Sequence, residues 1–198
     1  ESIFEKLYLE VSAIMKSLPY SYEYIFIDNC STDTTVNIIK KLAKKDKNLK
    51  LIINARNFGH IRSPQHAIYQ STGDACILLH ADLQDPPSLL KEFITQWEAG
   101  AKIVLGQKVD SEENKLMFHL RKKYYRLMNK ISETQIIENC TGFGLMDREV
   151  VNIMRKMNDP NPYLRGLLVE IGFPITLVPY KQRLRYGGET KLSIFILY

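Results

Sequence analysis

The feature that most limits the possible folds is a regular alternation of strand-like and helix-like segments along residues 1–106. Short runs rich in β-branched and aromatic side chains indicate strands. They alternate with segments whose apolar residues recur every three or four positions, which indicates helices. Strands are predicted at 22–28, 49–54, 74–80 and 102–106, and helices at 3–15, 34–45, 63–71 and 88–98. This alternation predicts an α/β fold, a mainly parallel sheet with helices on both faces.

The second half of the sequence is less regular. A long basic helix is predicted at 114–132, strands at 142–147 and 175–179, and a helix at 148–157. No G-x-G-x-x-G and no G-x-x-x-x-G-K-[ST] pattern occurs in the sequence. A Rossmann dinucleotide site and a P-loop are therefore both disfavoured.

Composition places the chain among ordinary globular domains. It has 198 residues, 45% hydrophobic and 25% charged, which is enough for one domain with a real core. Its net charge of +5 suits phosphates or a membrane surface, but without a recognised module it does not favour nucleic acid. The three cysteines contain no short-spaced pair, so buried free thiols in a reducing compartment are expected. No apolar run approaches the ~20 residues that span a bilayer.

Polar segments follow two of the predicted strands, where ligands bind in open parallel sheets. Residues 28–33 (DNCSTD) follow the first strand, and residues 80–87 (HADLQDPP) follow the third. Without a glycine-rich phosphate loop, a divalent cation held by oxygen ligands could bind a substrate phosphate. Asp82 and Gln84 could supply a carboxylate and an amide oxygen for such an ion.

Both polar segments also have a plain structural interpretation. Asp28 and Asn29 are typical turn formers. Asp85 and Ser88 could cap the helix that follows them. The residues alone leave these alternatives open.

Five segments in the same order give the chain a specific resemblance. They are NCSTD at 29–33, NARNFGHIRSP at 54–64, HADLQDPP at 80–87, TGFGLMDREV at 141–150 and RYGGETK at 185–191. Together they resemble the family-2 inverting glycosyltransferases of the GT-A (nucleotide-diphospho-sugar transferase) fold. More narrowly, they resemble the polyprenyl-phosphate sugar transferases, the group of dolichyl-phosphate mannose synthase and bactoprenol glucosyltransferase.

The resemblance implies a donor site for a nucleotide-diphosphate sugar. The residues that it assigns to this site are Asp28, Asn29, Ser31, Asn57, Ala81, Asp82, Arg185 and Lys191. Asp82 and Gln84 match the metal-binding D-x-Q of the family, which implies Mg²⁺ or Mn²⁺. His80 stands where the family usually has an aspartate, so it is a metal ligand, a hydrogen-bond partner or a bystander. Arg185 and Lys191 would clamp the leaving diphosphate, unless they form a solvated basic turn.

The acceptor implied by the resemblance is a polyprenyl phosphate. A phosphate monoester with a second pKa of ~6 is mostly dianionic at neutral pH, so it can attack without a strong general base. Arg121 and Arg126 on the basic helix would bind this phosphate, with Arg126 the first choice. The alternative is a solvated helix face or one that faces lipid headgroups. Phe143 could line the acceptor pocket, and Gly142 and Gly144 could let the backbone approach substrate.

The expected function is inverting transfer of a hexose, from UDP-hexose by preference, to a polyprenyl phosphate at the cytoplasmic face of the cell membrane. Asp82, Arg126 and Arg185 are the expected catalytic residues of this hexosyltransferase. Residues 1–191 are expected to form the catalytic domain, with its first strand missing before Glu1. Residues 192–198 are expected to open an interface helix that leads to transmembrane segments absent from this sequence.

Two other functions stay open. One is a glycosyltransferase of the same fold with a glycan or lipopolysaccharide acceptor. The other is a degenerate, non-catalytic module that binds nucleotide sugars, suggested by His80 and by the missing strand. A homo-oligomer is an open alternative to a monomer, and nucleic acid is not an expected partner.

Overall fold

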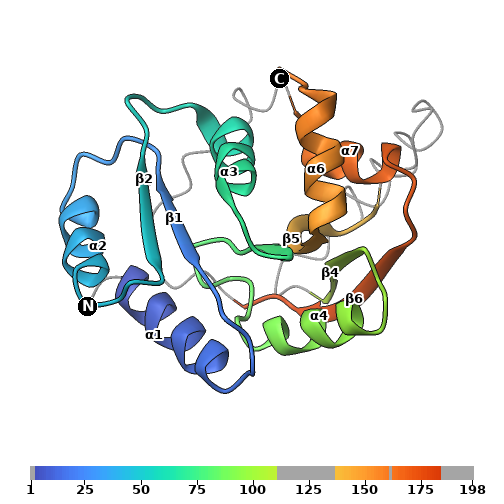
Figure 1. Cartoon of the computed structure of the whole chain (residues 1–198), viewed down its shortest axis with the longest axis horizontal. Helices are drawn as coiled ribbons and strands as arrows, with labels where there is room; N and C mark the ends of the chain where they lie inside the picture. The colour runs from blue at the N-terminus through green and yellow to red at the C-terminus, as the bar shows by residue number, and fades with distance from the viewer. Residues whose placement is uncertain (1–2, 111–136, 161, 184–198) are drawn as a thin grey trace.

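Helices lie on both sides of a central layer of strands (Figure 1). The computed structural model describes residues 3–110, 137–160 and 162–183. Its elements are α1 (Ile3–Lys16), β1 (Tyr24–Asp28), α2 (Thr35–Ala43), β2 (Leu49–Ile53), α3 (Gly59–Gln70), β3 (Ala75–Leu78), α4 (Leu89–Glu98), β4 (Ile103–Asp110), β5 (Cys140–Asp147), α6 (Arg148–Met157), α7 (Leu164–Glu170) and β6 (Ile175–Lys181). All predicted elements within the described residues are present, and α7 is an addition.

The strands form two hydrogen-bonded groups. β1 and β2 pair in parallel, from Tyr24 opposite Leu49 to Asp28 opposite Ile53. The second group has the order β3-β5-β4-β6, in which β5 runs antiparallel to both neighbours and β6 runs parallel to β4. The predicted α/β class is correct, but the sheet is mixed rather than mainly parallel. Strand-like residue patterns carry no direction, and the long segment between β4 and β5 allows an antiparallel return.

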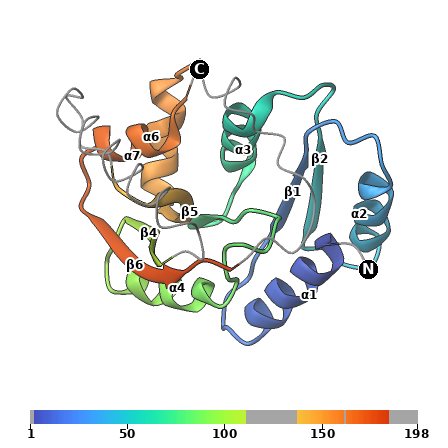
Figure 2. The same ribbon diagram turned by 180° about the vertical axis from the view of Figure 1, so that it is seen from behind.

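Three apolar clusters hold the layers together. Ile39 and Phe26 belong to the cluster between α1, α2 and the first strand pair. On one face of the four-stranded group, α4 packs against β5 through Phe93 and Phe143, whose ring centroids are 4.8 Å apart. Ile68 of α3 and Met154 of α6 belong to the third cluster. Figure 2 shows β6 at the rim of the sheet beside α4. Within the described ranges, no helix is long and apolar enough to cross a bilayer.

An apolar cavity of about 410 Å³ lies between β1 and β3. Its lining includes Phe4 and Leu7 of α1, Phe26 of β1, Ile77 of β3, and Leu90 and Ile94 of α4. Ile27, His80 and Ala81 reach it from the carboxyl ends of the two strands. The two groups of strands thus face each other across this cavity.

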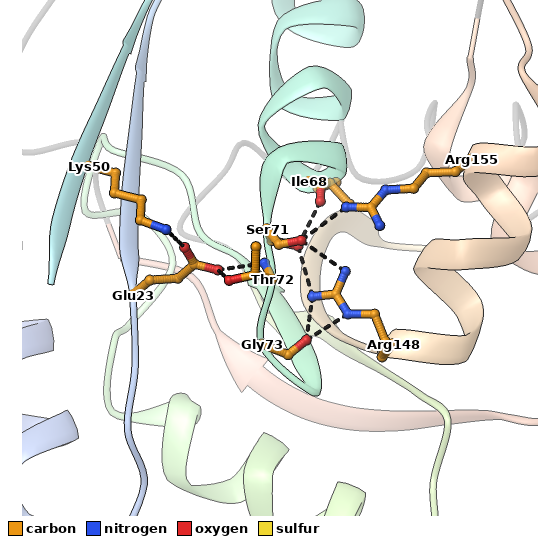
Figure 3. A network of polar contacts seen from close by, with 8 residues as sticks. All are labelled: Glu23, Lys50, Ile68, Ser71, Thr72, Gly73, Arg148 and Arg155. Carbon is orange, nitrogen blue, oxygen red and sulfur yellow. Dashed lines mark hydrogen bonds and ion pairs between the residues drawn. The ribbon is translucent and has the colours of Figure 1, made fainter.

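Polar contacts join the two strand groups at their amino ends (Figure 3). Glu23 lies just before β1, and its carboxylate accepts hydrogen bonds from the Thr72 amide at 2.6 Å and the Thr72 hydroxyl at 2.8 Å. Lys50 of β2 pairs with the other carboxylate oxygen at 2.5 Å. Burial alone would raise the pKa of Glu23, but the Lys50 and Thr72 hydrogen bonds outweigh it and lower the pKa to about 2.

The loop that carries Thr72 is fixed from the other side by two arginines of α6 (Figure 3). Arg148 donates to the Ser71 carbonyl at 3.0 Å and to the Gly73 carbonyl at 2.6 Å. Arg155 donates to the Ser71 carbonyl at 2.9 Å. Charge-assisted bonds of this kind are stronger than neutral ones, so this loop is well anchored to α6.

Candidate active site

The loop after β1 is a tight turn held by its first residue. Asp28 is only 5% exposed, and its Oδ2 accepts the Ser31 amide at 2.9 Å. Cys30 has a left-handed backbone with φ of 67°, which a non-glycine residue adopts at a cost. The turn-forming interpretation of Asp28 is therefore confirmed. Its contact with a nucleoside stays a prediction.

Asn29 fastens a second loop onto this turn. Its Oδ1 accepts the Phe58 amide at 2.8 Å, and its Nδ2 donates to Asn57 Oδ1 at 2.7 Å. Asn57 Oδ1 also accepts the Gly59 amide at 2.8 Å. Two residues that the resemblance assigns to the donor site, Asn29 and Asn57, are thus in direct contact although 28 positions separate them.

The loop after β3 places the predicted metal ligands in one turn. Asp82 Oδ1 accepts the Gln84 amide at 3.1 Å, and Leu83 between them is left-handed with φ of 59°. The Gln84 carbonyl accepts the Arg183 amide at 3.2 Å, which ties this loop to the end of β6. Both loops that follow the two strands therefore contain one strained non-glycine residue. Strain of this kind clusters at functional sites in proteins.

Asp85 differs from its predicted helix-capping role. It is 2% exposed, one oxygen lies 2.6 Å from His80 Nδ1, and the other accepts the Tyr180 hydroxyl at 2.5 Å. Ser88, the N-cap residue of α4, makes no capping bond through its side chain. Burial would raise the pKa of Asp85, but the His80 hydrogen bond and charge outweigh it and lower the pKa. The capping interpretation of Asp85 and Ser88 is wrong, because the carboxylate is turned inward to a histidine and a tyrosine.

The residues of this loop are compatible with a hard divalent ion. Asp82 and Gln84 offer oxygen ligands, and both are half-buried. Within the described ranges, no three histidine, cysteine, aspartate or glutamate side chains are close enough to form a metal site by themselves. An ion here would need substrate phosphates to complete its coordination, which is the usual arrangement for Mg²⁺. Ala81, the other donor-site residue of this loop, lines the cavity between β1 and β3.

Phe143 and Gly144 of the glycine-rich β5 belong to the core. Phe143 is fully buried and packs against Phe93 and Tyr180, so the predicted place in the acceptor pocket is wrong. A Cβ on Gly144 would lie 2.2 Å from the Val104 carbonyl oxygen, so this glycine allows close approach of β4. Gly142 has φ of 94° and lies near Leu164 of α7.

Four predicted site residues lie outside the described residues: Arg121, Arg126, Arg185 and Lys191. The same is true of the basic helix at 114–132 and of the interface helix at 192–198. Their roles stay predictions.

A second pocket, of about 140 Å³, contains residues that the sequence did not identify. His80 lines it together with His60, Arg165 and Tyr163. Arg165 belongs to α7, and Tyr163 directly precedes it. This seven-residue helix is too short to leave a clear periodic pattern in the sequence. His60, expected to be a donor-loop or a surface residue, is exposed at this pocket, and a role in the donor loop stays a prediction.

Two solved structures are similar in fold to this chain. One is *Staphylococcus aureus* TarS, residues 1–349, with a TM-score of 0.53 and 14% identity, covering 92% of this chain and 57% of that chain. Another is the mannosyltransferase PcManGT of *Pyrobaculum calidifontis*, in complex with GDP-Man and Mn²⁺, with a TM-score of 0.54 and 16% identity over 89% and 51% of the two chains. At these identities the likeness concerns the fold, and it confirms the predicted GT-A architecture.

Sequence comparisons identify the family. The chain is 31% identical to the uncharacterized glycosyltransferase YkcC of *Bacillus subtilis*, over 98% of this chain and 60% of that protein. It is 35% identical to a prophage bactoprenol glucosyl transferase homolog of *Escherichia coli*, over 88% and 57%, and to the bactoprenol glucosyl transferase of *Shigella* phage SfX, over 88% and 58%. The chain thus spans somewhat more than half the length of these relatives. Residues 7–154 match the model of glycosyl transferase family 2, and the chain belongs to that family.

Proposed function

We propose that the protein transfers a hexose from a nucleotide-diphosphate sugar, UDP-hexose by preference, to a polyprenyl phosphate with inversion at the anomeric carbon. The observation that carries the proposal is the pair of strained polar loops after β1 and β3. Relatives named bactoprenol glucosyl transferases support a polyprenyl acceptor. The fold neighbour PcManGT, solved with GDP-Man and Mn²⁺, supports a nucleotide-sugar donor and a divalent ion.

In the proposed mechanism, the donor lies across the carboxyl ends of β1 and β3. The loop that Asn29 and Asn57 stabilise would hold the nucleoside end of the donor. Asp82 and Gln84 would hold Mg²⁺ or Mn²⁺ against the diphosphate. When bound, that ion would offset the negative charge that develops on the leaving group. Arg185 and Lys191 would add positive charge on the same group.

The acceptor phosphate would react without a strong general base. One of its oxygens forms the new bond to the anomeric carbon while the bond from that carbon to the diphosphate breaks on the opposite face of the sugar. Arg126, with Arg121, would orient the phosphate for this attack. The lipid headgroup would reach the protein at the cytoplasmic face of the membrane.

The proposed domain division follows from the same arrangement. Residues 1–191 would form the catalytic domain, and residues 192–198 would begin an interface helix at the membrane. A further strand, placed ahead of α1, would fit the cavity between β1 and β3, where it could pair with both strands. Phe4 contacts Phe26, and Tyr8 stacks on Tyr24. Helix α1 therefore runs antiparallel to β1 and begins on the side of the carboxyl end of β1.

The decisive test is an assay of the full-length protein with undecaprenyl phosphate and a panel of UDP- and GDP-sugars, with and without Mg²⁺ or Mn²⁺. We expect transfer from one donor that stops when the ion is removed. Asp82→Asn should reduce transfer at least 100-fold, since it removes an ionic ligand. Asp74→Asn is the matched control, because Asp74 is exposed at the opposite end of β3.

The alternative functions predict different results in this assay. Transfer to a glycan acceptor, but none to undecaprenyl phosphate, would indicate the glycan-acceptor enzyme. In that case Arg126→Ala should leave activity nearly unchanged, whereas our proposal predicts a large loss. Nucleotide binding without any turnover would indicate the non-catalytic module.

A further inference from the structure

The end of β6 lies against the loop after β3 and makes two hydrogen bonds to it. The Arg183 amide donates to the Gln84 carbonyl at 3.2 Å, and the Tyr180 hydroxyl donates to the Asp85 carboxylate at 2.5 Å. Gln84 and Asp85 are consecutive in the sequence. The end of β6 therefore holds the loop at one expected ion ligand, Gln84, and at the residue that follows it.

The bond between Tyr180 and Asp85 is shielded from solvent. Tyr180 is 5% exposed and Asp85 is 2% exposed. The other oxygen of the Asp85 carboxylate lies 2.6 Å from His80 Nδ1, so both of its oxygens have a partner. Because almost no water reaches this carboxylate, water cannot easily replace the Tyr180 hydroxyl if that donor is lost.

The Tyr180 ring is held in the orientation that this bond needs. It lies edge-on to the Phe143 ring, with centroids 5.8 Å apart and an interplanar angle of 82°. A Cβ on Gly106 of β4 would lie 3.0 Å from Tyr180 Cε1 and 3.0 Å from Phe143 Cδ1. The glycine therefore leaves the space that the two rings occupy, and the packed ring directs its hydroxyl to Asp85.

The loop that β6 holds contains backbone strain. Leu83 has φ of 59°, and a non-glycine residue keeps such a conformation only where its surroundings fix it. Within the turn, Asp82 Oδ1 accepts the Gln84 amide at 3.1 Å. The two bonds from β6 act on the residues directly after the strained one. If they weakened, the turn could relax, and the oxygens of Asp82 and Gln84 would move relative to each other.

We propose that Tyr180 is a positioning residue of the ion site, and that its hydroxyl acts through Asp85 to keep Asp82 and Gln84 in the arrangement that an ion requires. The part of this inference that concerns the ion rests on the proposed function, whereas the part that concerns the loop does not. Mg²⁺ demands near-ideal ligand geometry, so a small shift of two ligands lowers the affinity for such an ion.

The variant Tyr180→Phe tests the proposal, because it removes only the hydroxyl. Two quantities are measured on the full-length protein. One is amide hydrogen exchange in residues 81–85 without ligand, and the other is the affinity for Mn²⁺ at saturating UDP, followed by electron paramagnetic resonance. We expect the exchange to become about 3- to 10-fold faster and the Mn²⁺ affinity to fall about 3- to 10-fold, the effect of one lost hydrogen bond.

Two other variants separate positioning from general stability. Tyr69→Phe is the matched control, because the Tyr69 hydroxyl also donates a hydrogen bond, at 2.9 Å to the Met154 carbonyl, but joins α3 to α6. It should leave the loop exchange and the Mn²⁺ affinity within about 2-fold of wild type. Asp85→Ala tests the route, since adding Tyr180→Phe to it should lower the Mn²⁺ affinity no further. Urea unfolding of every variant measures the change in stability.

Unchanged loop exchange in Tyr180→Phe would overturn the proposal. An equal loss of Mn²⁺ affinity in Tyr69→Phe would overturn it too, since lower stability alone would then explain the effect. A further loss on adding Tyr180→Phe to Asp85→Ala would show that Tyr180 does not act through Asp85. If the wild-type protein bound no Mn²⁺ with UDP, the ion site of the proposed function would fail, and the loop exchange would distinguish that failure from a wrong assignment of Tyr180.

Discussion

Replacing Glu23 by glutamine should weaken the fold in a pH-dependent way. Glu23 is the carboxylate that joins β1, β2 and the loop before β3, and its pKa of about 2 lies well below the ordinary 4.5. A group whose pKa is lower in the folded state contributes stability above its unfolded-state pKa and loses it as the pH falls through the folded value. The contribution of Glu23 is therefore complete above about pH 5 and is lost between about pH 4.5 and pH 2.

The magnitude follows from the size of that pKa change. At 1.36 kcal/mol for each pKa unit, the difference between 4.5 and about 2 limits the contribution of the Glu23 charge to the free energy of unfolding to about 3 kcal/mol. Solvent reduces this value, because the Lys50 side chain is 54% exposed and that of Glu23 is 18% exposed. We expect Glu23→Gln to lower the free energy of unfolding by about 1–2 kcal/mol at pH 7, and by almost nothing at pH 2.

Urea unfolding followed by circular dichroism measures this difference at pH 7, 4 and 2.5. Glu170→Gln is the matched control, because Glu170 is an exposed glutamate at the end of α7, and its substitution should have no pH-dependent effect. An equal loss at pH 7 and at pH 2.5 would refute the reasoning, since it would show that the carboxylate charge is not what stabilises the fold.

Three further predictions concern the core and the site. Gly144→Ala should destabilise the protein by more than about 2 kcal/mol in thermal or urea unfolding, because its methyl group would meet the Val104 carbonyl. Phe143→Ala should lower the free energy of unfolding by about 3–5 kcal/mol in the same assay, because Phe143 is fully buried. If Phe143 instead lined the acceptor pocket, the main effect of the substitution would be a loss of lipid affinity. Exposed Cys30 should react with a thiol reagent long before Cys140, whose pKa burial raises to about 11, and a bound nucleotide should slow that reaction.

Local structure was predictable from the sequence where the residue pattern is strong. The segment 148–157 is a helix with the predicted bounds, because Asp147 caps it through the Glu149 amide and Val150, Val151 and Met154 share its buried face. The helix predicted from residue 63 begins earlier, at Gly59. The seven-residue α7 was missed, since two helical turns leave too few apolar repeats to separate it from a loop.

Strand direction and inward-turned polar groups could not be predicted. Alternating apolar residues in 142–147 indicate a strand, but its antiparallel direction depends on how the chain returns from β4. Asp85 reads as a helix cap in the sequence, and its real partners, His80 and Tyr180, are 5 and 95 positions away. Local preference cannot reveal a partner so distant in the sequence. The resemblance placed Asn29 and Asn57 in one donor site, and their direct contact agrees with that grouping.

The position of Glu23 has a consequence for motion. Its bonds to Lys50 and Thr72 fasten the two strand groups at their amino ends, while the polar loops occupy the carboxyl ends across the apolar cavity. The side-chain bonds of Glu23 therefore link the two strand groups at one end of the cavity, on the amino side. A molecule bound by both loops would link the two groups at their carboxyl ends as well, and amide hydrogen exchange in β1 and β3 would then slow most at the residues farthest from Glu23.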